Sequence, residues 1–200
     1  MNYITFDIET YTPGETLETA GRSGINTTNM RVSTIGAYFS WIDQYLVFWE
    51  DQAEEFMEIM QNADLVIGFN HVWFDLPVMQ KYAKYPVNTL PIYDLMLEFE
   101  KKVGYKIKLN DLAKSNLPIK KTDTFSEFRT YHLKDEWFKL ADYCMHDVKI
   151  TEDLFRMILA GKPLKYADML NSYETKLDKP NLEKSQNSAS VTGLLVEELF

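Results

Sequence analysis

The stretch NYITFDIETYT, residues 2–12, places two carboxylates among residues that favour β-strands. In a strand, residues two positions apart point to the same face. Asp7 and Glu9 are therefore expected to project side by side, with Phe6 and Ile8 on the opposite face. Like charges held this close repel each other, so the sequence predicts a compensating partner beside them.

The composition predicts a single domain with its own core. The chain has 200 residues, of which 46% are hydrophobic and 14% aromatic. The single cysteine, Cys144, excludes an internal disulfide framework and a cysteine-based zinc site. No apolar run approaches the ~20 residues of a transmembrane helix, and the N-terminus lacks the signal-peptide pattern. We therefore expect a soluble protein of the cytoplasm with no membrane partner.

The charge distribution is uneven along the chain. A net charge of −9 argues at first against a nucleic-acid partner. Residues 101–121, however, carry seven lysines and one acid, which makes this segment +6 and the remainder −15. A solvated lysine face is the plain alternative to a binding surface. If the segment lies beside an acidic site, Lys106 and Lys108 are candidates for contacts with a nucleic-acid substrate.

The pattern of apolar residues and breakers predicts an α/β fold. Strands are expected at residues 2–9, 31–40, 44–50, 64–70 and 89–95, and helices at 51–63, 73–85, 109–116 (with Asn110 near its cap) and 134–160. A hairpin followed by alternating helices and strands indicates a mixed sheet with helices packed on it. We expect a catalytic domain over residues 1–162 and a polar extension over 163–200 that ends in a short apolar patch.

Three places carry acids in apolar, structured surroundings. Asp7 and Glu9 lie in the first strand, Asp75 follows the apolar strand at 64–70, and Asp147 lies in the long helix. Tyr143 precedes Asp147 by four residues and therefore shares its helix face. Carboxylates that converge need cations, and hard oxygen ligands suit Mg²⁺ or Mn²⁺. Two such ions about 3.5–4 Å apart are the standard device for in-line phosphoryl displacement.

The segments FDIET (6–10), GFNHVWFD (68–75) and YCMHD (143–147) resemble the three motifs of the DEDD superfamily of 3′–5′ exonucleases. This superfamily includes the proofreading domains of DNA polymerases. The third motif resembles that of the tyrosine subgroup, in which a tyrosine stands four residues before the aspartate, as Tyr143 does before Asp147. The histidine subgroup has a histidine five residues before the aspartate, and here position 142 is Asp. The resemblance spans roughly residues 3–155.

This resemblance implies a ribonuclease H-like fold, with a mixed five-stranded sheet containing one antiparallel strand and flanked by helices. It implies that Asp7, Glu9 and Asp147 hold the metal ion that carries the attacking water. Asp7 would bridge to a second ion near Asp75, and Tyr143 would orient the water because its ordinary pKa makes it a poor base. The implied reaction is hydrolysis of the terminal phosphodiester, which releases nucleoside 5′-monophosphates.

Two residues of the second motif are candidates for substrate contacts. Asn70 is expected to touch substrate or orient the site, and Phe74, like Trp73, to stack on the terminal base. Core packing is an equal alternative for the two aromatic residues. The loop at 12–30, with Arg22 and Arg31 near its end, either touches the 3′ end or is a simple excursion.

The histidines offer a competing interpretation. His146 and Asp142 form an i, i+4 pair that would suggest a general base. That pair and the Tyr143–Asp147 pair cannot both face the metals, because one residue turns a helix by ~100°. We expect His146 at the surface or behind the ligands. His71 and His132 are expected to be ordinary polar residues, and Cys144 a small core residue.

The leading hypothesis is a two-metal 3′–5′ exonuclease acting on single-stranded or frayed DNA, working with replication or repair proteins in trans. A 3′–5′ exoribonuclease is the alternative within the enzyme class, because no residue reports on the 2′-hydroxyl. A catalytically silent nucleic-acid-binding module is the alternative from another class. The C-terminal VEELF (196–200) resembles sliding-clamp peptides only in its last two residues.

Overall fold

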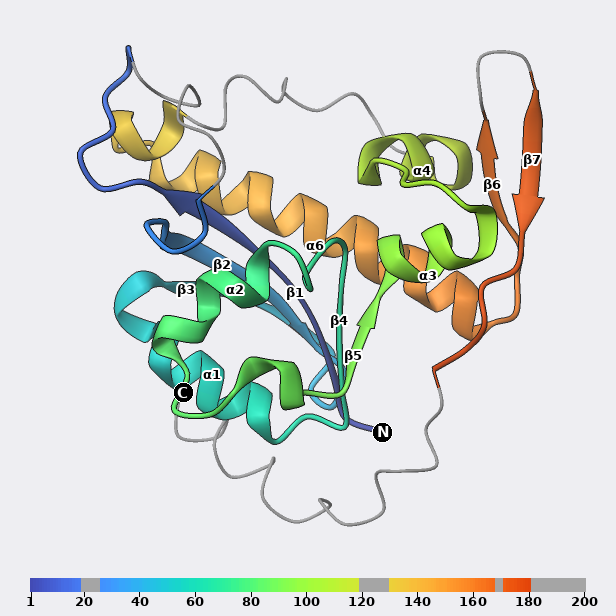
Figure 1. Cartoon of the computed structure of the whole chain (residues 1–200), viewed down its shortest axis with the longest axis horizontal. Helices are drawn as coiled ribbons and strands as arrows, with labels where there is room; N and C mark the ends of the chain where they lie inside the picture. The colour runs from blue at the N-terminus through green and yellow to red at the C-terminus, as the bar shows by residue number, and fades with distance from the viewer. Residues whose placement is uncertain (19–25, 119–129, 168–170, 181–200) are drawn as a thin grey trace.

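The computed structural model describes residues 1–18, 26–118, 130–167 and 171–180. Its centre is a five-stranded sheet in the order β3-β2-β1-β4-β5 (Figure 1). The strands are β1 (Tyr3–Tyr11), β2 (Arg31–Phe39), β3 (Gln44–Trp49), β4 (Leu65–Gly68) and β5 (Ile92–Asp94). β2 is antiparallel to both of its neighbours, whereas β1, β4 and β5 are parallel to one another. The predicted mixed sheet with one antiparallel strand is confirmed.

Helices cover both faces of this sheet. They are α1 (Ala53–Gln61), α2 (Asp75–Met79), α3 (Leu95–Val103), α4 (Leu109–Asn116) and α6 (Trp137–Leu159). Short 3₁₀ turns lie at η1 (Glu50–Gln52), η2 (Gln80–Tyr82), η3 (Val87–Thr89) and η4 (His132–Lys134). Residues of α1 and α2 belong to one buried cluster, and residues of α3, α4 and α6 belong to another. Among the described residues, no helix combines the length and apolar character needed to cross a bilayer.

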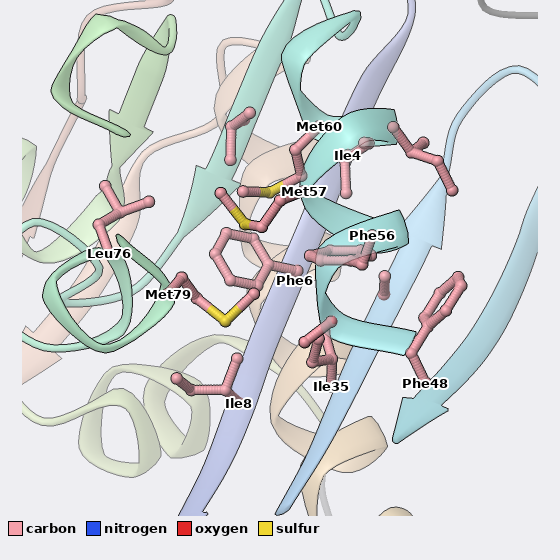
Figure 2. Packing of buried hydrophobic residues seen from close by; sticks show 14 of the residues in the cluster. Ile4, Phe6, Ile8, Ile35, Phe48, Phe56, Met57, Met60, Leu76 and Met79 are labelled. Atoms are coloured by element: carbon pink, nitrogen blue, oxygen red, sulfur yellow. The ribbon is translucent and has the colours of Figure 1, made fainter. Parts of the chain in front are cut away.

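The first buried cluster fixes the orientation of β1. Phe6 and Ile8 are buried in it, and the ring of Phe6 packs on Phe56 of α1 with centroids 5.5 Å apart (Figure 2). Met57 and Met60 of α1 complete this layer. Each such side chain contributes about 1.5–3 kcal/mol on burial. The alternation therefore forces the odd-numbered residues of β1 to the opposite face, as the sequence predicted.

The opposite face of β1 packs on α6. On the neighbouring strand β2, Gly36 lets α6 approach the sheet closely. A Cβ atom at Gly36 would lie 3.1 Å from the Sγ atom of Cys144 and equally close to a methyl group of Val148. Cys144 is buried, as predicted, but it also makes polar contacts. Its sulfur accepts a hydrogen bond from the Gly36 N–H at 3.2 Å, and its thiol donates to the main-chain carbonyl of Asp7 at 3.3 Å. The helix is thus fixed directly over the carboxylates of β1.

A buried polar network fixes the other half of α6. Glu152 is fully buried and accepts hydrogen bonds from the hydroxyls of Tyr3 at 2.8 Å and Thr5 at 2.6 Å. Arg156 donates to the same carboxylate at 2.7 Å. Because a buried charge is costly unless it is paired, these three donors are what make Glu152 compatible with the core. Tyr3 and Thr5 therefore determine the position of the helix along β1.

Several predicted boundaries differ from the structure. α3 follows β5 directly, where we expected only a strand and a turn, because Asp94 caps the helix through the N–H groups of Met96 and Leu97. The predicted helix at 73–85 is a short α2 followed by η2. Asn110, predicted near the cap of this helix, lies in the first turn of α4, and Lys108 is the N-cap residue.

The expected C-terminal extension contains a hairpin of β6 (Leu164–Ala167) and β7 (Ser172–Thr175). Leu164 and Leu177 are buried in the same cluster as α6, so this part of the extension joins the existing core. The boundary at residue 162 stays a prediction. Residues 181–200, with the VEELF segment, and Arg22 of the long loop lie outside the described residues.

Candidate active site

The second half of β1 supplies the first two carboxylates. Asp7 pairs with Gly36 and Glu9 with Thr34 across the antiparallel ladder, which directs both side chains toward α6. Asp7 remains partly accessible, and Glu9 is 6% exposed. The predicted arrangement of the two acids on one face is present.

The turn after β4 supplies Asp75. Asn70 adopts a left-handed conformation with φ of 68°, which asparagine tolerates better than most residues. Its carbonyl accepts hydrogen bonds from the N–H groups of Trp73 at 3.3 Å and Phe74 at 3.2 Å. This tight turn ends at Asp75, the first residue of α2, which is 3% exposed. The carboxylate is thus buried at the carboxyl end of a central parallel strand.

A further carboxylate, Asp94 at the end of β5, holds this turn in place. It accepts hydrogen bonds from the N–H groups of Asn70 at 2.9 Å and Val72 at 3.1 Å. The same carboxylate caps α3, so it connects two elements beside the site. Sequence reasoning missed Asp94, although an aspartate before an apolar helical pattern is the usual signal of an N-cap.

Helix α6 supplies the remaining two predicted residues. Tyr143 and Asp147 lie one turn apart, and the Tyr143 hydroxyl hydrogen-bonds to the Asp147 carboxylate. Burial raises the pKa of Tyr143, and the nearby charges of Asp147, Glu9 and Asp7 raise it further. The phenol therefore keeps its proton at neutral pH, so it can donate or orient but cannot act as a base.

Asp7 lies within electrostatic reach of the other three carboxylates. Burial raises the pKa of Asp7 well above its usual range, and the charges of Asp75, Asp147 and Glu9 raise it further. Burial also raises the pKa of Asp75, and raises that of Asp147 to about 7 against the opposing effect of the Tyr143 hydrogen bond. Such shifts are typical of acids that repel one another in a partly desolvated site.

The donor set fits a divalent cation. Asp7, His71 and Asp75 each offer one ligand atom, and these atoms all lie within 4.8 Å of one another. Carboxylate oxygens are the ligands that Mg²⁺ and Mn²⁺ prefer, and a cation would offset the repulsion that raises the pKa of Asp7. The expectation that His71 is an ordinary polar residue is wrong about its place, because the structure puts it inside this cluster.

The other predicted contact residues lie around the rim. Trp73 is 61% exposed, and the Lys106 ammonium lies 5.9 Å from the centre of its ring. Phe74 and Asn70 are half-buried. Among the described lysines of residues 101–121, Lys106 and Lys108 have no carboxylate partner, whereas the others pair with acids. An exposed aromatic ring and a lysine without a carboxylate partner among the described residues thus lie together at the turn that leads to Asp75.

A cavity of about 700 Å³ lies where β1 ends and β2 begins. Tyr11, Trp49, His132 and Trp137 line it, and the rings of His132 and Tyr11 stack at 4.1 Å. The ladder shifts register after Glu9, and Ser33 lines the cavity opposite this bulge. Its hydroxyl has no hydrogen-bond partner within the part of the chain that the structure describes. His132 is therefore part of a cavity wall rather than an isolated polar residue.

The competing histidine pair does not form a site. Asp142 is exposed, and among the described residues no ion pair joins it to His146. His146 is half-buried, and its Nε2 atom is buried without a hydrogen-bond partner. Tyr143 and Asp147, rather than Asp142 and His146, share the face of α6 that meets Asp7 and Glu9.

Comparison with known proteins agrees with this fold. A sequence model of the RNase H superfamily matches residues 4–159. A search of curated proteins gave no match. Among solved structures, the fold resembles the family B DNA polymerase from the hyperthermophilic archaeon Pyrobaculum calidifontis, with a TM-score of 0.57 and 16% identity over 79% of this chain.

The matched part is 24% of that polymerase chain, so the present chain spans about a quarter of its length, and at this identity the likeness concerns the fold alone. The family match covers all five strands of the central sheet and α6. The predicted ribonuclease H-like fold is confirmed, and the chain belongs to the RNase H superfamily.

Proposed function

We propose that this protein is a divalent-metal-dependent 3′–5′ exonuclease that hydrolyses the terminal phosphodiester of DNA at single-stranded or frayed 3′ ends. Membership of the RNase H superfamily supports nuclease activity in general. The observation that carries the finer proposal is the convergence of four carboxylates from β1, α2 and α6. The products would be nucleoside 5′-monophosphates.

Asp7, Glu9, Asp75 and Asp147 would hold two Mg²⁺ or Mn²⁺ ions. When bound, such ions lower the pKa of a water and neutralise charge on the phosphoryl group. Asp7 is the natural shared ligand, because the charges of the other three acids all raise its pKa. It lies on the middle strand of the sheet, beneath α6.

The remaining residues would position the substrate. The Tyr143 hydroxyl, protonated and hydrogen-bonded to Asp147, would orient the attacking water. Trp73 would offer a stacking surface and Lys106 a cation for the backbone of a single strand. These two residues adjoin the turn that carries Asp75, so a strand held there would end at the carboxylates.

The loss of stability that the clustered acids impose on the metal-free fold disfavours the alternative of a catalytically silent binding module. Burial and mutual repulsion both raise the pKa of Asp7, so holding these acids ionised destabilises the metal-free fold. A surface that only bound nucleic acid would not need a cluster of acids that destabilises the fold. An exoribonuclease is the alternative within the enzyme class, and the relative rates of DNA and RNA digestion separate the two activities.

The test is a digestion panel with oligonucleotides labelled at one end. With Mn²⁺ or Mg²⁺, 5′-labelled single-stranded DNA should shorten one nucleotide at a time, and 3′-labelled DNA should release labelled mononucleotide at once. Blunt duplex, duplex with frayed 3′ ends and RNA complete the panel. Internal cuts appearing first would contradict the exonuclease proposal, and faster loss of RNA would favour the exoribonuclease.

A further inference from the structure

We propose that His71 is a nitrogen ligand of the metal ion held between Asp7 and Asp75. This mixed nitrogen and oxygen set would favour a divalent first-row transition ion over Mg²⁺ at that position. The inference rests on the metal-dependent function proposed above, because it concerns the same carboxylates. It adds to them a histidine of the second motif, which was not among the expected ligands, and changes the expected metal preference.

The burial of His71 is the first observation. Its side chain is 0% exposed, and neither Nδ1 nor Nε2 has a hydrogen-bond partner among the described residues. Buried polar groups are almost always paired, so two unpaired nitrogens on one ring need an explanation. A metal ion at one of them would supply the missing partner.

The packing around the ring is the second observation. A Cβ atom at Gly68 would lie within 1.7–2.0 Å of three atoms of the His71 ring, so only glycine leaves room for it. The ring also packs on Phe6, with centroids 4.1 Å apart. His71 is therefore held in a slot shaped around it, and the His71 carbonyl accepts a hydrogen bond from the Leu76 N–H at 3.0 Å.

The distances are the third observation. The Nε2 atom of His71 lies 4.0 Å from Oδ2 of Asp75, which is too long for a hydrogen bond. The three potential ligand atoms of Asp7, His71 and Asp75 lie within 4.8 Å of one another. Donors around one ion at about 2.1 Å stand roughly 3–4 Å apart, so small side-chain rotations would close the site.

The chemistry of the donor set gives the metal preference. Mg²⁺ favours oxygen ligands in near-ideal octahedral geometry and gives up its water ligands reluctantly. Imidazole binds transition ions more readily, and sites with nitrogen ligands follow the order of increasing affinity from Mn²⁺ to Cu²⁺. Two carboxylates and one imidazole should therefore bind Mn²⁺ or Co²⁺ more tightly than Mg²⁺.

The direct test is spectroscopic and uses the whole chain loaded with Mn²⁺. Electron spin-echo spectra of the unchanged protein should show coupling of Mn²⁺ to a ¹⁴N nucleus. The coupling should vanish in His71→Phe, which keeps a planar ring in the slot against Phe6. It should persist in His132→Phe, the same substitution at a histidine outside the cluster.

Calorimetric titration provides the second readout. In His71→Phe, the affinity for Mn²⁺ should fall about 10–100-fold, while that for Mg²⁺ changes by less than about 3-fold. Circular dichroism and thermal melting establish that the variant is folded. If it does not fold, the ¹⁴N coupling of the unchanged protein still decides the question.

The outcomes separate the two proposals. Bound Mn²⁺ without ¹⁴N coupling, in a protein that still digests DNA, overturns the role of His71 and leaves the exonuclease proposal standing. An unchanged Mn²⁺ affinity in folded His71→Phe does the same. No binding of Mn²⁺ or Mg²⁺ and no hydrolysis would overturn the proposed function itself.

Discussion

The carboxylate of Asp94 accepts a 2.9 Å hydrogen bond from the backbone N–H of Asn70, across the gap between β5 and the turn after β4. The same side chain accepts bonds from Val72 and from the first turn of α3. All four of these hydrogen bonds come from backbone N–H groups. It acts on Asp75 by fixing the turn from which Asp75 projects.

Replacing Asp94 with alanine should therefore reduce both stability and activity. Four backbone N–H groups lose their acceptor, and we expect a loss of about 2–4 kcal/mol in the free energy of unfolding. Hydrolysis by the folded fraction should also fall, because Asp75 is no longer held in register with Asp7. Urea unfolding and the initial rate of DNA digestion measure the two effects.

Asp111→Ala is the matched control, because Asp111 is an exposed acid in the first turn of the neighbouring α4. Its loss should change stability by less than about 0.5 kcal/mol. Equal stabilities of the two variants would contradict the anchoring role of Asp94.

The metal-free protein should lose stability as the pH rises from about 4 to 8. The pKa of Asp147 is raised to about 7 in the folded chain, and the pKa values of Asp7 and Asp75 are also raised. The folded state therefore binds more protons than the unfolded state in this window, so the free energy of unfolding falls with rising pH. With chelator present, the melting temperature should be several degrees lower at pH 8 than at pH 5.

Asp147→Asn provides the comparison for this pH dependence. The amide removes one of the repelling charges, so the metal-free variant should melt higher than the unchanged protein at pH 8 and show a shallower slope. Added Mn²⁺ should raise the melting temperature of the unchanged protein at pH 8 more than that of the variant. A pH-independent melting temperature in chelator would show that burial and mutual repulsion do not raise the pKa values of these acids.

Trp73 and Lys106 should contribute to binding of single strands. Trp73→Ala removes an exposed stacking surface, for which we expect a loss of about 1–3 kcal/mol in binding free energy. Lys106→Ala should weaken binding less, and should make the dependence on salt shallower by about 0.7 in a plot of log K against log salt concentration. Fluorescence anisotropy of a labelled oligonucleotide with Ca²⁺ or chelator measures binding without digestion.

Lys101→Ala is the control for the charge. Lys101 lies in the same lysine-rich segment, but it pairs with Glu98 on α3. Its substitution should leave the salt dependence unchanged. If Lys101 and Lys106 variants behave alike, the segment acts as a diffuse positive surface rather than through the pair beside Trp73.

Much of the site could be predicted because it depends on local periodicity. The alternation of β1 forces Asp7 and Glu9 to one face once Phe6 and Ile8 enter the core, and the helical period places Tyr143 beside Asp147. These relationships follow from the repeat of a strand and of a helix. The same periodicities apply to any strand or helix that has one face buried.

The parts that were missed depend on contacts between distant residues. His71 reads as an ordinary polar residue because nothing in its neighbours reveals that Gly68 and Phe6 leave a closed slot for its ring. The apolar run through Leu95 predicts a strand and turn at 89–95, and the sequence pattern predicts no helix over the rest of α3. A single side chain, Asp94, decides where the strand stops and the helix begins.

The most direct measurement is the hydrolysis of 5′-labelled single-stranded DNA by the unchanged protein and by Asp7→Asn, each with Mn²⁺, Mg²⁺ or EDTA. Asp7 interacts with the other three acids, so its loss should reduce the rate by at least about 10³-fold, which corresponds to several kcal/mol of transition-state stabilisation. Stepwise shortening from the 3′ end is expected only from the unchanged protein with metal. Digestion by Asp7→Asn at the full rate, or digestion that persists in EDTA, would contradict it.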